Sequence, residues 1–98
     1  MADLILPLKT EYFDAIKAGN KPEEFRLVND YWTRRLHGRD GKPRTFDRIV
    51  LTKGYPKRGD DSRRLVRPWK GFTRKTLTHS HFGAEPVEIF AIDVRLSF

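Results

Sequence analysis

The sequence predicts a small α+β domain, and two observations predict it. The segments that read as secondary structure run strand, helix, strand, helix and then mainly strands, an order typical of α+β proteins. The strand expected over 46–52 carries apolar residues on both faces, as a sheet covered on both sides requires. With 98 residues there is room for one hydrophobic core. We therefore expect a single domain over 1–98, a small mixed β-barrel with one or two short helices packed beside it.

Individual residues mark the ends of these elements. Pro7 cannot donate to a sheet ladder, so it should lie at an edge or at a strand end. Thr10 is a plausible N-cap for the first helix, Gly19 can end that helix, and Asn29-Asp30 can cap the second. The elements are expected as a strand over 4–8, a helix over 11–18, a strand over 23–28, a helix over 31–36 with Arg34 and Arg35 outward, a strand over 46–52, a loop over 54–64, a strand over 64–72, a strand or turn over 73–78, a turn over 83–86 and a strand over 87–98.

Composition excludes several classes of protein. The chain has no cysteine, which removes disulfides, thiolate metal sites and cysteine nucleophiles. No apolar run approaches the ~20 residues of a membrane-spanning helix, and the N-terminus lacks the pattern of a signal peptide. We therefore expect a cytoplasmic protein that does not contact a membrane.

Positive charge is concentrated in the middle of the chain. The formal net charge is +7, yet the segment from Arg34 to Lys75 holds fifteen cations against four carboxylates, a net +11. Such a field attracts polyanions, and aromatic residues interleaved with the cations are what single-stranded nucleic acid binding needs. The alternative for Trp69 is a place in the core. The candidate nucleic-acid-binding residues are Lys53, Tyr55, Lys57, Arg58, Arg63, Arg64, Arg67, Trp69 and Lys70.

A second candidate site follows the first helix, in the stretch from Gly19 to Arg26. Glu24 and Arg26 project from the same face of the expected strand, and Lys21 arrives from the turn before it. An exposed salt bridge on a solvated turn is the simpler interpretation of this spacing. A lysine beside a carboxylate can also serve as base and acid, with Arg26 binding an anion.

Other catalytic constellations are weak or missing. His79-Ser80-His81 would point two imidazoles the same way along a strand, but a zinc site needs three or four ligands. We therefore expect neither a metal nor another cofactor. No serine lies in a nucleophile-elbow sequence, and no glycine-rich phosphate loop is present.

The stretch after the first helix resembles the motif of the ASCH domain family, a branch of the PUA-like fold. That motif is Gly-x-Lys-x-x-Glu-x-Arg, and here it reads Gly19, Lys21, Glu24 and Arg26. The resemblance implies a barrel whose cleft is lined by these residues and a role in binding RNA. The chain is similar to the small, basic members of this family that are found in bacteria and phages.

The resemblance also implies two possible enzymatic activities. Some members are amidohydrolases that deacetylate N4-acetylcytidine with a lysine as base and a threonine as nucleophile. Lys21 matches that lysine, but Glu24 stands where the threonine would be. Other members are proposed to be metal-independent ribonucleases. The expected function is binding of RNA or single-stranded nucleic acid. One alternative is a hydrolase of either kind that uses Lys21 and Glu24. The other alternative is a module that binds an acidic protein partner.

Overall fold

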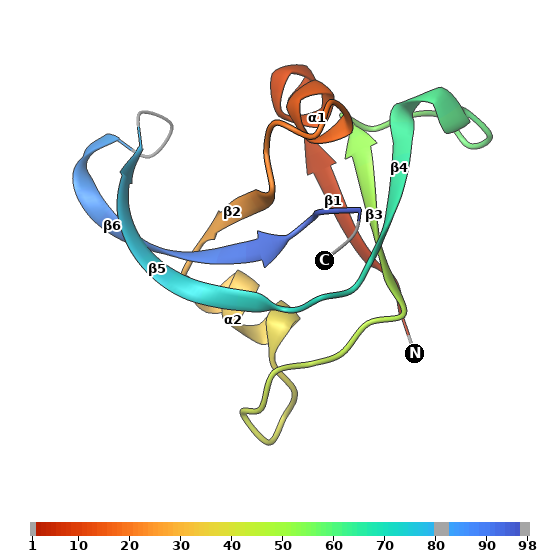
Figure 1. Ribbon diagram of the computed structural model, residues 1–98. Coiled ribbons are helices and arrows are strands. Elements are labelled where there is room, and N and C mark those ends of the chain that lie inside the picture. Colours follow the sequence, from red (N-terminus) through yellow and green to blue (C-terminus); the bar gives the residue numbers. More distant parts are fainter. Residues whose placement is uncertain (1, 80–82, 97–98) are drawn as a thin grey trace.

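The computed structural model describes residues 2–79 and 83–96, which form six strands in two sheets with two helices beside them (Figure 1). One sheet has the order β1-β3-β4, from β1 (Leu4–Leu8), β3 (Arg48–Lys53) and β4 (Arg64–Pro68). The other has the order β2-β6-β5, from β2 (Glu23–Leu27), β6 (Gly83–Asp93) and β5 (Phe72–His79). The helices are α1 (Thr10–Lys17) and α2 (Asp30–Leu36), and a 3₁₀ turn, η1 (Asp61–Arg63), precedes β4. The α+β class is confirmed.

The two sheets do not close into a barrel, so the expected barrel is not confirmed. β1 and β2 each lie at the edge of their own sheet. The backbone carbonyls of Ile5 and Pro7 on β1 accept hydrogen bonds from the guanidinium groups of Arg35 and Arg26. Side chains from β2 and α2 therefore occupy the backbone carbonyls that a neighbouring strand would bind in a closed barrel. Pro7 also has no N–H to donate to such a strand.

Both sheets and both helices contribute to one core. The strand expected over 4–8 is present as β1, and its burial alternates, with Leu4, Leu6 and Leu8 buried and Ile5 exposed. The middle strand β6 is buried at four consecutive positions, 89–92, because it has a strand on each side and is covered on both faces. The buried cluster consists of Leu4, Leu6, Leu8, Phe13, Ile16, Leu36, Phe46, Ile49, Leu51, Phe90, Ile92 and Val94.

The C-terminal strand differs from its expected bounds at both ends. The expected turn over 83–86 is wrong, since these residues begin β6 and Gly83 pairs with His79. The ladder shifts register between Leu77 and His79, and this irregularity lies opposite the part of β6 that contains Pro86, which cannot donate to a ladder. β6 ends at Asp93 because its partner there, Glu23, is the first residue of β2. Phe98, the expected end of the strand, lies outside the described residues.

Several other expected boundaries shift for local reasons. Thr10 is the first residue of α1 and not its N-cap; Lys9 holds that position without a side-chain hydrogen bond. Asn29 caps α2 as expected, since its Oδ1 accepts from the Trp32 N–H at 2.9 Å. The strand expected over 64–72 ends at Pro68, and the segment expected as strand or turn over 73–78 is strand β5. Neither helix in the described part of the chain is long and apolar enough to cross a membrane.

Candidate functional site

The turn between α1 and β2 brings the motif residues together. Gly19 follows α1 with a φ of 81°, in the left-handed region that glycine adopts without strain, and its N–H donates to the Ile16 carbonyl. β2 then places Glu24 and Arg26 on one face, opposite Ile92 and Phe90 of β6. The shared face predicted from the spacing is therefore present, and it points toward the interior.

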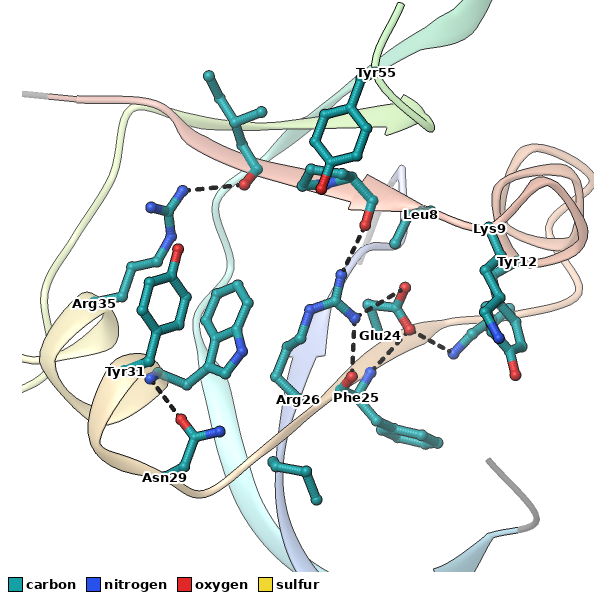
Figure 2. Close-up of a pocket in the computed structure, with 15 residues that line it drawn as sticks. Leu8, Lys9, Tyr12, Glu24, Phe25, Arg26, Asn29, Tyr31, Arg35 and Tyr55 are labelled. Atoms are coloured by element: carbon teal, nitrogen blue, oxygen red, sulfur yellow. Dashed lines mark hydrogen bonds and ion pairs between the residues drawn. The ribbon is translucent and has the colours of Figure 1, made fainter. Parts of the chain in front are cut away.

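Glu24 is a buried carboxylate held between two cations. Its side chain is 5% exposed, and Oε1 lies 3.3 Å from Lys21 Nζ while Oε2 lies 3.4 Å from Arg26 Nη1 (Figure 2). Oε1 also accepts from the Phe25 N–H at 3.0 Å. Two cations offset the large cost of removing a carboxylate from water. The simpler interpretation, an exposed salt bridge, is therefore wrong.

One oxygen of this carboxylate has charge compensation but no hydrogen bond. Oε2 is buried and accepts no hydrogen bond; Arg26 Nη1 lies 3.4 Å from it as an ion pair and donates to the Phe25 carbonyl at 3.0 Å. A buried acceptor left without a donor costs about 1–3 kcal/mol. An unsatisfied acceptor inside a site is therefore a feature that a ligand can use.

Lys21 is fixed by several contacts. Its Nζ donates to the Glu23 carbonyl at 2.6 Å in addition to its ion pair with Glu24. It also lies over the ring of Phe25, 4.6 Å from the centroid, and 5.5 Å from that of Tyr12. The ammonium is thus a fixed positive charge at one end of the site.

Two arginines flank Trp32 at the other end. The guanidinium carbons of Arg26 and Arg35 lie 5.3 Å and 5.6 Å from the Trp32 ring centroid. Each arginine also donates to a β1 carbonyl at 3.1 Å. Cation–π contact and backbone hydrogen bonds together set the positions of these cations.

These side chains line a cavity of about 640 Å³ between β1 and β2. Among the described residues, its lining contains four cations, one carboxylate and five aromatic side chains, of which Tyr55 and Tyr31 are 91% and 61% exposed. A volume of this size is typical of small-molecule sites, and the charge balance favours an anionic ligand with an aromatic or planar part. The lining residues are Ile5, Pro7, Leu8, Lys9, Tyr12, Lys21, Glu24, Phe25, Arg26, Leu27, Asn29, Tyr31, Trp32, Arg35 and Tyr55.

The structure separates most of the basic middle segment from this cavity. Tyr55 alone among its candidate residues lines the cavity. Lys53 pairs with Asp14 at 3.1 Å, and Arg63 pairs with Asp60 at 3.5 Å. Lys57 and Arg58 are exposed in the loop before η1.

The remaining candidates of that segment stabilise the fold. The guanidinium group of Arg64 donates to the Lys57 and Asp60 carbonyls at 3.1 Å and 2.9 Å, which holds the loop before β4. Arg67 Nε donates to the Val94 carbonyl at 3.2 Å, and Lys70 donates to the Arg95 carbonyl.

Trp69 belongs to the edge of the core. Its ring lies 4.9 Å from that of Phe46 and 6.3 Å from that of Phe72, centroid to centroid, and it is partly buried against the core cluster. Core placement, the alternative noted for this residue, is the one that the structure shows.

Sequence reasoning missed the part of the site contributed by α2 and by the residue before α1. Tyr31, Trp32 and Arg35 line the cavity, as does Lys9. The expectation that Arg35 points outward is wrong, because its guanidinium group reaches the Ile5 carbonyl. The available signal was two aromatic residues and an arginine within one short helix directly after the motif strand.

A metal site finds no further support. Within residues 2–79 and 83–96, no group of three or more His, Cys, Asp or Glu side chains could hold a metal ion. Ser80 and His81 of the weak histidine pattern lie outside the described residues.

Comparison with known proteins gives no match for this chain among protein families, curated proteins or solved structures. The site is therefore interpreted from its own chemistry.

Proposed function

We propose that the protein binds RNA or another single-stranded nucleic acid and takes one nucleotide into the cavity between β1 and β2. The observation that carries this proposal is the lining itself, where Lys9, Lys21, Arg26 and Arg35 outnumber the single carboxylate of Glu24, a net +3, among five aromatic side chains. Cations neutralise phosphate, and aromatic rings stack on bases of any sequence.

A single-stranded ligand fits this cavity better than a duplex. A base enters a pocket of nucleotide size only when it is unpaired and unstacked. The exposed ring of Tyr55 at the cavity is available to stack on such a base. The net charge of the chain, +7, speeds encounter with any polyanion.

The same proposal includes membership of the ASCH family and its PUA-like arrangement. It is supported by the motif residues Lys21, Glu24 and Arg26, which line one side of the cavity directly after the Gly19 turn.

Binding of a labelled single-stranded RNA, followed by fluorescence anisotropy, tests the proposal. Affinity should fall steeply between about 50 and 200 mM salt, because phosphate contacts release counterions. Arg35→Ala should weaken binding more than Arg34→Ala, its neighbour on α2, because Arg35 lines the cavity and Arg34 does not. Affinity that ignores salt, or equal losses in the two variants, would contradict the proposal.

The two alternative functions, hydrolysis and binding of an acidic protein, each need an experiment of their own. We place binding ahead of hydrolysis because the Lys21 ammonium already donates to the Glu23 carbonyl and pairs with Glu24. Incubation with labelled RNA and with an acylated nucleoside would reveal turnover, and Lys21→Ala should then abolish it. An acidic protein partner would be retained after nuclease treatment in a pull-down, whereas an RNA-mediated association would be lost.

A further inference from the structure

We propose that Glu24 reads the exocyclic amino group of the bound base, so that the cavity prefers adenine and cytosine to their keto counterparts, hypoxanthine and uracil. This inference rests on the proposed function and adds base selectivity to it.

Among the described residues, few side chains of the cavity are strong hydrogen-bond acceptors. Ammonium and guanidinium groups donate hydrogen bonds and cannot accept them. Of the described residues that line the cavity, Glu24 is the one carboxylate, and the Asn29 Oδ1 already accepts from the Trp32 N–H. A base that offers an N–H donor therefore meets its strongest acceptor at Glu24.

The two oxygens of the Glu24 carboxylate differ in their hydrogen bonds. Oε1 accepts from the Phe25 N–H, whereas Oε2 has no hydrogen bond. The nearby Arg26 Nη1, at 3.4 Å, is directed to the Phe25 carbonyl. Oε2 can therefore accept one hydrogen bond from a ligand.

The depth of Oε2 restricts the kind of donor that can reach it. The atom is buried, so a ligand bonds it only through a donor that projects from the ring of the base. The hydrogen bonds of Arg26 go to the Pro7 and Phe25 carbonyls, so a donor from the ligand can bond Oε2 without replacing a hydrogen bond of Arg26. An exocyclic amino group projects from the ring, whereas a ring N–H is flanked by a carbonyl that would face the carboxylate. The burial of Oε2 therefore favours amino-bearing bases.

The experiment compares short oligouridylates that differ at one central base. The central base is adenine, hypoxanthine, cytosine or uracil, so each amino base is matched to its keto counterpart on an identical backbone. The wild-type protein should bind the adenine and cytosine oligomers at least about tenfold more tightly than the hypoxanthine and uracil oligomers, a difference of about 1.4 kcal/mol.

Glu24→Gln supplies the second readout. The amide oxygen should occupy the Oε1 position, where the Phe25 N–H is a fixed donor, and the amide NH₂ then takes the Oε2 position. The site would offer a donor where it offered an acceptor, so the amino preference should disappear or reverse. Removing a carboxylate also raises affinity for every phosphate, and the ratio between matched oligomers, not the affinity, is therefore the measurement.

Glu23→Gln is the matched control. It makes the same chemical change one residue earlier, where the side chain pairs with Lys75 at 2.6 Å and does not line the cavity between β1 and β2. This variant should keep the wild-type ratio.

The outcomes separate the two proposals. Equal binding of amino and keto oligomers by the wild-type protein overturns this inference and leaves nucleic-acid binding standing. A wild-type ratio retained in Glu24→Gln also overturns it, because another group then reads the base. Binding to none of the oligomers overturns both proposals. If Glu24→Gln fails to fold, the wild-type comparison still tests the inference, because equal binding of amino and keto oligomers overturns it.

Discussion

Replacing Arg26 by alanine removes the side chain that joins the two sheets beside the cavity. Its guanidinium group donates to the Pro7 carbonyl at 3.1 Å and to the Phe25 carbonyl at 3.0 Å, and it pairs with the buried Glu24. A hydrogen bond to a charged group contributes about 1.5–3 kcal/mol, and water entering the vacated space recovers part of that. We therefore expect the free energy of unfolding to fall by about 3 kcal/mol, which lowers Tm by roughly 12–24 °C in a domain of this size.

Urea and thermal unfolding followed by circular dichroism measure this loss. Arg48→Ala is the control, because its ion pair with Asp3, at 3.1 Å, is on the surface and the arginine side chain is 53% exposed. Such a pair contributes at most about 1 kcal/mol. Adding Glu24→Gln to Arg26→Ala should cost less than the two changes separately, since a neutral amide needs no cation beside it. If Arg26→Ala lost no more than Arg48→Ala, the bridging role of Arg26 would be refuted.

Tyr55, Trp69 and the Asp93–Arg95 pair each have an effect that one substitution can isolate. Tyr55→Ala should leave the urea midpoint unchanged, since the ring is 91% exposed. Loss of base stacking should weaken RNA binding by about 1–3 kcal/mol. An unchanged dissociation constant would show that Tyr55 does not belong to the site. Trp69→Ala should lower Tm through lost packing on Phe46, while the folded variant binds RNA as the wild type does; a selective loss of binding at unchanged Tm would contradict the core assignment. The hydrogen bond from Arg95 lowers the pKa of Asp93, so this pair stabilises the fold above the unfolded pKa of about 3.9, and the contribution is lost as pH falls through the lowered folded pKa. Urea midpoints of Arg95→Ala and wild type should therefore differ at neutral pH and converge in acid, and a gap that widens in acid would contradict this cause.

The elements that sequence predicted well are those whose ends carry local signals. Gly19 ended the first helix because few other residues adopt its positive φ, and Asn29 capped the second because its side chain reaches the Trp32 N–H. The C-terminal strand was harder, since its length depends on neighbours elsewhere in the chain. Its start at Gly83 depends on pairing with β5, and its end at Asp93 on where β2 begins.

The same division applies to the site. Alternation along β2 placed Glu24 and Arg26 on one face, and this needed no knowledge of the rest of the chain. Which face is buried, and what meets it, was decided by the order of strands in the two sheets. That order leaves β1 and β2 as facing edges and brings α2 and Tyr55 to the gap between them.

In the basic middle segment, only the tertiary structure determines which cations line the cavity. Lys53, Arg64 and Arg67 look alike in the sequence, but their side chains find a carboxylate or backbone carbonyls within the fold. Arg35, one more cation of that segment, is carried by α2 to the β1 edge and into the cavity. Local sequence set the charge and the turns of this protein, whereas pairing between distant strands selected the few cations that form its site, because contacts across the chain depend on sheet order and not on neighbouring residues.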